Sequence, residues 1–70
     1  MNDQQKFLQD ELESIQESIQ VKGYVAKHHV AELKSLDEMA AECQESNSIS
    51  FDWLVEFRMQ VEATMGFVSF

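Results

Sequence analysis

Apolar residues between positions 7 and 43 recur mostly at intervals of three and four, which is the spacing of one face of an α-helix. Near the start of this segment lie acidic residues, where the helix dipole favours negative charge. The pattern therefore predicts a long amphipathic helix over residues 7–44. Its stripe consists of Leu8, Leu12, Ile15, Ile19, Ala26, Val30, Leu33, Leu36, Ala40 and Cys43.

Gly23 is the position at which this first helix is expected to kink or break. A glycine directly after Lys22 has the arrangement of a helix C-cap, with Tyr24 placed to pack back onto Ile19. However, no Ser, Thr, Asp or Asn follows Gly23 to cap a new helix, and the apolar stripe keeps its phase across the glycine. Two arrangements stay open: one long or kinked helix, or two helices separated at Gly23.

The segment QESNSIS, residues 44–50, interrupts the periodic pattern and predicts a polar loop. Ser50 is suited to be an N-cap, and Ile49 and Leu54 have the spacing of a hydrophobic staple. A new helix is therefore expected to begin at Phe51.

The last segment alternates, because every odd position from Phe51 to Phe67 is apolar, as in a strand. Nothing else in the chain alternates at length, so a strand here has no partner and leaves both backbone edges unpaired. Glu, Arg, Met and Gln in the segment favour helix. We therefore predict a second helix over about 51–68. It is apolar on two sides, one of them formed by Val55, Met59, Ala63 and Phe67.

These elements predict an all-α fold with one small domain over residues 1–70, an antiparallel helical hairpin. The expected hairpin core consists of Leu33, Leu36, Ala40, Trp53, Leu54, Phe57, Val61 and Met65. A second helix about 27 Å long cannot cover a first helix about 55 Å long, so apolar surface is left for a partner. The expected partner-binding residues are Val55, Met59, Phe67, Leu8, Leu12, Ile15 and Ile19. The alternative is a three-helix bundle, in which a break at Gly23 folds the N-terminal segment over the second face.

Composition supports a helical chain, since there is no proline and only two glycines among 70 residues. The formal net charge is −8, with −4 in residues 1–20, +2 in residues 21–34 and −6 in residues 35–70. This sign argues against binding to nucleic acids or anionic membranes. No apolar run approaches the length of a membrane span, and a single cysteine suits a reducing compartment, so a cytoplasmic location is expected.

Candidate chemistry is sparse. His28 and Glu32 are helical neighbours, but two ligands do not make a structural zinc site, and Cys43 lies about 22 Å from His28 along a continuous helix. Cys43 also has no third group to complete a nucleophilic site, and no glycine-rich phosphate loop occurs. We therefore expect no enzymatic activity, no metal and no cofactor.

The layout of residues 7–68 resembles the small co-chaperones of type III secretion needle proteins. The matching features are the amphipathic first helix, the loop QESNSIS and the apolar second helix FDWLVEFRMQVEATMGFV. The resemblance implies a cytoplasmic, non-enzymatic helical hairpin. Its expected partners are a helical-repeat chaperone and a small secreted subunit, which the pair of chaperones holds before export.

Two other functions stay open. One is a small acidic inhibitor of the phage type, which blocks a basic nucleic-acid-binding site on a target enzyme and whose binding weakens with salt. The acids, however, are spread along the chain. The other is a self-associating module that forms a homo-oligomer when alone.

Overall fold

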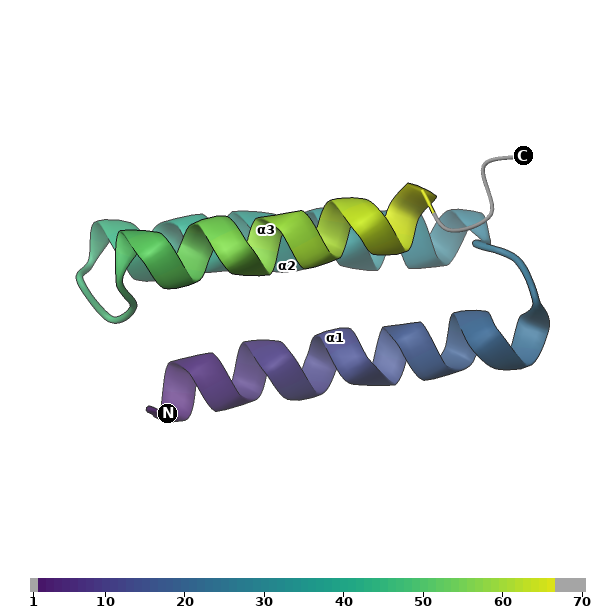
Figure 1. Cartoon of the computed structure of the whole chain (residues 1–70), viewed down its shortest axis with the longest axis horizontal. Helices are drawn as coiled ribbons and strands as arrows, with labels where there is room; N and C mark the ends of the chain where they lie inside the picture. Colours follow the sequence, from purple (N-terminus) through teal and green to yellow (C-terminus); the bar gives the residue numbers. More distant parts are fainter. Residues whose placement is uncertain (1, 67–70) are drawn as a thin grey trace.

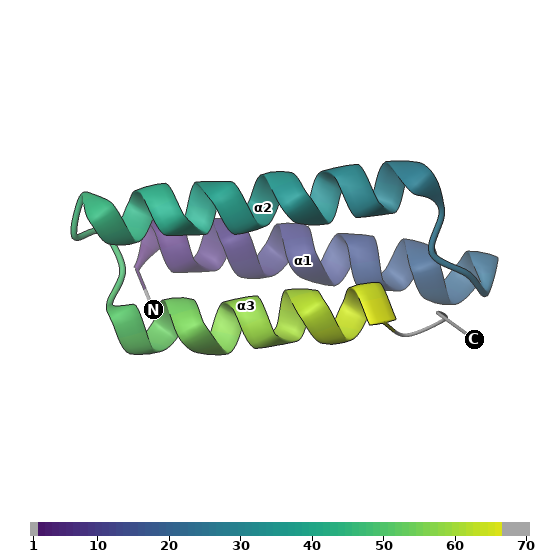
Figure 2. The same ribbon diagram turned by 90° about the horizontal axis from the view of Figure 1, so that it is seen from above.

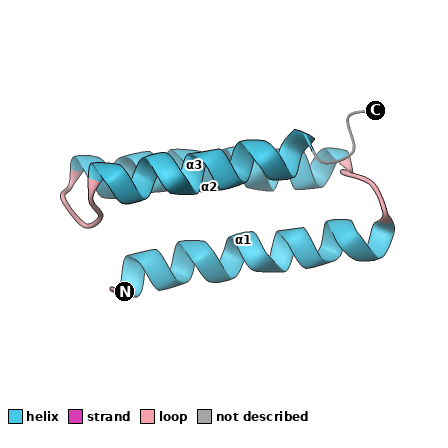
Figure 3. Cartoon of the chain, viewed as in Figure 1, coloured by secondary structure: helices cyan, strands magenta, loops and turns pink. Residues whose placement is uncertain are grey.

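The computed structural model describes residues 2–66, which form three helices joined by two short connections (Figure 1). Helix α1 spans Asp3–Lys22, α2 spans Lys27–Glu45 and α3 spans Phe51–Gly66. Helix α2 runs antiparallel to the other two (Figure 2). No strand occurs in residues 2–66 (Figure 3). The all-α prediction is confirmed, and the three-helix bundle fits the structure in place of the expected hairpin.

Gly23 breaks the predicted long helix. Its backbone has a φ of 83°, in the left-handed region, and its N–H donates to the carbonyl oxygen of Ile19 at 2.7 Å. This is the αL form of helix C-cap, which a glycine adopts without the steric cost that a Cβ would add. The expectation of one continuous helix was wrong because this turn reverses the chain. The longest dimension of the molecule is accordingly 36 Å, well short of a 55 Å helix.

Caps fix the starts of α1 and α3. The side chain of Asn2 accepts from the backbone N–H of Gln5 at 2.8 Å, and the Gln5 side chain accepts from the Asn2 N–H at 3.0 Å. The Asn2 amide also donates to the carbonyl oxygen of Ser48, which ties the start of α1 to the α2–α3 loop. At α3, the Ser50 hydroxyl accepts from the N–H of Trp53 at 3.1 Å. The predicted N-cap at Ser50 is thus confirmed.

All three helices share one core. Its buried apolar residues are Leu8, Leu12, Ile15, Ile19, Leu33, Leu36, Ala40, Ile49, Leu54, Phe57 and Val61. Most of the expected hairpin core therefore lies inside the bundle, and Trp53 and Met65 pack against it while partly buried. Burying a side chain as large as Leu or Phe stabilises the fold by about 1.5–3 kcal/mol, so this core is the main source of stability.

The stripe of α1 has a different role from the one expected. Leu8, Leu12, Ile15 and Ile19 were assigned to a partner-binding face, but all four are buried in the core of the chain itself. The reason is the turn at Gly23, which lays α1 along α2 and α3 (Figure 2). This apolar surface is therefore not available to a partner in the folded monomer.

Candidate protein-binding surface

Helix α3 buries one side and exposes a second row of apolar side chains. Its buried side consists of Leu54, Phe57, Val61 and Thr64. On another side Phe51, Val55 and Met59 follow one another every four residues, and they are 56%, 42% and 63% exposed. We refer to these three residues as the outer α3 row. Val55 and Met59, both expected to bind a partner, thus lie at the surface, and Phe67 lies outside the described residues.

The outer α3 row borders α2. Arg58 on α3 donates from Nε to Oδ1 of Asp37 on α2 at 2.8 Å, so the side of α3 that carries Arg58 faces α2. Val55 lies one helical turn before Arg58 on that side of α3. On α2, Ala41 and Glu45 continue the row of Asp37 at four-residue intervals. We refer to the surface made by these two helical rows as the α2–α3 face.

Negative charge is concentrated in one half of the bundle. Helix α2 runs opposite to α1 and α3, so one end of the bundle contains the start of α1, the end of α2 and the start of α3 (Figure 2). The residues at this end, around the N-terminus of α1 and the α2–α3 loop, are 3–13, 36–45 and 51–60. These ranges hold ten carboxylates and two cations, a formal net charge of −8. Residues 14–35 and 61–66 hold three carboxylates and three lysines, a net charge of zero. We refer to the first group as the acidic half.

The two cations of the acidic half are both ion-paired. Lys6 lies 3.2 Å from Asp10 on α1, and Arg58 lies 2.8 Å from Asp37. Each pair is well exposed, so it contributes little to stability. Each pair does, however, neutralise its cation locally. The remaining carboxylates therefore make the electrostatic potential around the acidic half negative.

The outer α3 row lies entirely within the acidic half. Asp52 and Glu56 alternate with its three apolar residues along α3, and Glu45 ends α2 just before the loop that leads to α3. The surface therefore combines exposed apolar side chains with a carboxylate border. A ligand that matches it must present apolar groups together with positive charge.

A buried histidine joins α1 to α2 at the opposite end of the molecule. His29 is only 1% exposed. Its Nδ1 accepts from the backbone N–H of Ala26 at 3.0 Å, and its Nε2 lies 2.9 Å from Oγ of Ser18 on α1. Nδ1 can accept only when it carries no proton, so this arrangement requires the neutral imidazole with its proton on Nε2. His29 thereby supplies the cap at the start of α2 that no Ser, Thr, Asp or Asn provides.

The surroundings of His29 favour the neutral form. Burial is the main cause that lowers the pKa of His29 below its ordinary value of 6.5, and the positive charges of His28 and Lys22 act in the same direction. The carboxylate of Glu32 acts in the opposite direction and raises the pKa. The net result is a lowered pKa, in keeping with the hydrogen bond that Nδ1 accepts.

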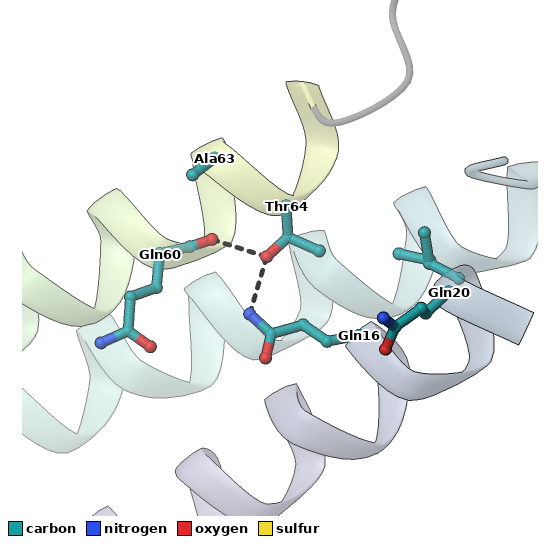
Figure 4. Close-up of a pocket in the computed structure, with 6 residues that line it drawn as sticks. Gln16, Gln20, Gln60, Ala63 and Thr64 are labelled. Atoms are coloured by element: carbon teal, nitrogen blue, oxygen red, sulfur yellow. Dashed lines mark hydrogen bonds between the residues drawn. The ribbon is translucent and has the colours of Figure 1, made fainter. Parts of the chain in front are cut away.

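Between α1 and α3 lies an open pocket of about 400 Å³ whose lining includes three glutamines (Figure 4). The amide nitrogen of Gln16 donates to Oγ1 of Thr64 at 3.0 Å, and the Thr64 hydroxyl donates to the carbonyl oxygen of Gln60 at 2.7 Å. Ile19, Gln20 and Ala63 complete the lining. No charged or metal-binding group lines the pocket, and Gln16 and Thr64 are joined to each other across it.

Metal-binding and nucleophilic residues do not come together in residues 2–66. No group of three His, Cys, Asp or Glu side chains in that range is placed to hold a metal ion. His28 and Cys43 lie on the same helix, about 22 Å apart, so the thiol has no histidine base beside it. Within the same range, no helix is both long and apolar enough to cross a bilayer.

Comparisons with known proteins give no relative: no family model, no curated protein and no solved structure matches this chain. The surface must therefore be interpreted from its own chemistry.

Sequence reasoning missed two features of the structure. The concentration of charge was not visible, because the acids are separated along the chain and only the turn at Gly23 places residues 3–13 beside residues 36–45. The cap by His29 was also missed, because the capping side chain belongs to the third residue of α2 and not to the N-cap residue itself. The available signal was the position of His29 three residues after Ala26, the spacing from which a side chain reaches back to the N-cap N–H.

Proposed function

We propose that this chain is a non-enzymatic protein-binding subunit that docks through the α2–α3 face. The observation that carries the proposal is the outer α3 row, in which three large apolar side chains stand exposed in line on a helix whose opposite side is buried. Scattered exposed apolar residues are normal, whereas a contiguous row with a polar border is typical of a protein interface.

The more specific form of the proposal is a cytoplasmic co-chaperone that pairs with a helical-repeat chaperone to hold a type III secretion needle subunit. Two features of the resemblance support it: the polar loop between α2 and α3, and a last helix with an exposed apolar row. The continuous first helix of such a hairpin is absent, because Gly23 divides it. A helical-repeat partner would accept the outer α3 row in its concave surface.

The second candidate is an acidic inhibitor that occupies a basic nucleic-acid-binding site on an enzyme. The observation that favours it is the acidic half, where the whole net charge of −8 is collected on one end of the molecule. Such an inhibitor would depend mainly on charge, so its binding would weaken steeply with salt. Binding of the apolar row in a hydrophobic surface would depend on salt much less.

The test is capture of the native partner by the tagged chain from its host, with identification by mass spectrometry. We expect Met59→Glu to abolish capture, because it places a charge in the middle of the outer α3 row. The matched control is Val21→Glu, which makes the same kind of change at an apolar residue that is 82% exposed in the neutral half. Capture that survives Met59→Glu would contradict the proposed surface. A helical-repeat chaperone among the captured proteins would support the co-chaperone, and a nucleic-acid enzyme would support the inhibitor.

A further inference from the structure

We propose that the occupant of the α2–α3 face is a basic amphipathic helix of another protein. This inference rests on the proposed function and adds to it the secondary structure and the charge of the partner segment.

The sign of the charge selects a cationic partner. The acidic half carries a formal net charge of −8, and its only two cations are already paired with Asp10 and Asp37. Nucleic acids and anionic membranes are repelled by such a surface. A segment rich in Lys or Arg is attracted to it, and long-range attraction also speeds its association.

The same negative charge disfavours a dimer of this chain through the α2–α3 face. A symmetric dimer brings the same patch of both protomers together. A dimer through the α2–α3 face would therefore place two acidic halves, each with a net charge of −8, against each other. Like charges opposed in an interface repel one another strongly, so this face disfavours self-association.

The shape of the surface selects a helix. Residues 2–66 contain no strand, so they offer no sheet edge to which an extended peptide could add. The contact must then be made by side chains alone. The outer α3 row spans about 12 Å along its helix, which is about two turns, and a partner helix with apolar residues at i, i+4 and i+7 covers the same length.

The border of the row sets where the partner carries its charge. Asp52 and Glu56 lie along α3, and Glu45 ends α2 on the helical row of Asp37, the residue that pairs with Arg58. Lys or Arg residues that flank the apolar stripe of the partner on both sides meet these carboxylates. A helix that has the same apolar stripe but acidic flanking residues is repelled by these carboxylates.

The experiment measures binding of two fluorescent helical peptides to the full chain by anisotropy. Both peptides contain Leu at i, i+4 and i+7 over about five turns, and their flanking positions are Lys in one and Glu in the other. We expect the Lys peptide to bind and the Glu peptide to bind at least about tenfold more weakly. We also expect the affinity for the Lys peptide to fall as NaCl is raised from about 50 to about 500 mM.

Two pairs of variants locate the site. Met59→Glu and Glu45→Lys change the row and its border, and each is expected to alter Lys-peptide affinity: Met59→Glu by disrupting the apolar contact, Glu45→Lys by repelling the peptide. Val21→Glu and Glu17→Lys make the same changes in the neutral half and are expected to alter affinity by less than about twofold. Circular dichroism shows whether each variant is folded.

The outcomes separate this inference from the proposed function. Equal binding of both peptides, or equal weakening by Glu17→Lys and Glu45→Lys, would overturn the basic helix and leave the surface as a docking site. Absence of binding to the Lys peptide, while Met59→Glu still abolishes capture of the native partner, would do the same. A native partner captured equally well by the Met59→Glu variant would overturn the proposed function itself.

Discussion

At the scale of the residue, His29 shows how one side chain can replace a missing cap. It lies at the third position of α2, where its Nδ1 accepts the N–H of Ala26, and its Nε2 lies within hydrogen-bonding distance of Ser18 on α1. The side chain is buried, so both contacts are shielded from water. A single neutral imidazole thus starts α2 and joins it to α1.

The first prediction follows from the pKa of His29. The unfolded chain takes up a proton at this residue near pH 6.5, whereas the folded protein, whose His29 pKa is lowered, stays neutral to a lower pH. As the pH falls through 6.5 the unfolded state therefore binds more protons, and the free energy of unfolding decreases. We expect the urea midpoint to fall between about pH 7.5 and about pH 5.5.

The control for this prediction is a pair of variants. His29→Gln keeps an oxygen that can accept the Ala26 N–H but does not titrate, so the fall in the urea midpoint over this pH range should become smaller. His28→Gln changes the exposed neighbour and should retain most of the fall. A pH dependence that is the same in the His29→Gln variant as in the parent would show that other groups cause it.

The second prediction concerns Gly23. Its φ of 83° is unfavourable for any residue with a Cβ, although the space around it is open. We expect Gly23→Ala to lower the free energy of unfolding by about 1 kcal/mol. In a continuous helix the same change would raise stability, since Ala is the better helix former, so the sign of the effect distinguishes the two folds. Urea denaturation measures the change in the free energy of unfolding. The comparison variant is Gly66→Ala, at a helical glycine with open space around it, which should be stabilising by about 0.5 kcal/mol.

At the scale of the element, α3 explains why its sequence alternates. Phe57 and Val61 fill the core, while Val55 and Met59 on another side stay exposed. Each of the two apolar rows repeats every four residues, and the rows are offset from each other by two. Together they place an apolar residue at every second position, as in a strand. The alternation is therefore a mark of a helix with two apolar sides, one buried in the molecule and one exposed.

The third prediction contrasts the two sides of α3. Phe57 is buried and its ring stacks on Trp53, with centroids 5.2 Å apart. We expect Phe57→Ala to cost about 3–5 kcal/mol, which is a large part of the stability of so small a domain. Met59→Glu on the exposed side should change the free energy of unfolding by no more than about 0.5 kcal/mol. Urea denaturation of both variants checks this, and a strongly destabilised Met59→Glu variant would show that the outer α3 row is part of the core.

Local signals predicted the elements better than they predicted their arrangement. The N-cap at Ser50 and the start of α3 followed from the residues of the loop itself. The position of α1 did not, because its apolar stripe stays in phase with that of α2 and serves equally well in one helix or two. The backbone angle at Gly23 decides between them, and the sequence does not display the shared core in which Ile15 and Ile19 are buried.

At the scale of the whole molecule, the arrangement of the helices brings into one half the ends of α1, α2 and α3 that hold most of their carboxylates. Each helix is moderately acidic, but the bundle gathers ten carboxylates in the half that also exposes the outer α3 row. Mutual repulsion among these groups destabilises the folded state. An arrangement that costs stability and coincides with exposed apolar surface fits the proposed docking surface, where a cationic partner would relieve the repulsion.

The last prediction tests this link between repulsion and binding at a single residue. Glu45 ends α2, where the helix dipole favours a cation, yet the last turn of α2 contains no basic residue. Glu45→Lys removes one negative charge from the acidic half and places a positive one at that helix end. We expect the free energy of unfolding in low salt to rise by about 0.5–1 kcal/mol, and the gain to shrink as NaCl screens the charges.

The same variant should bind the Lys peptide more weakly, because the border of the α2–α3 face has lost a carboxylate. Urea denaturation and anisotropy on one preparation measure both effects. A variant that gains stability without losing affinity would show that Glu45 is not part of the docking surface, and one that loses stability would show that Glu45 supports the fold.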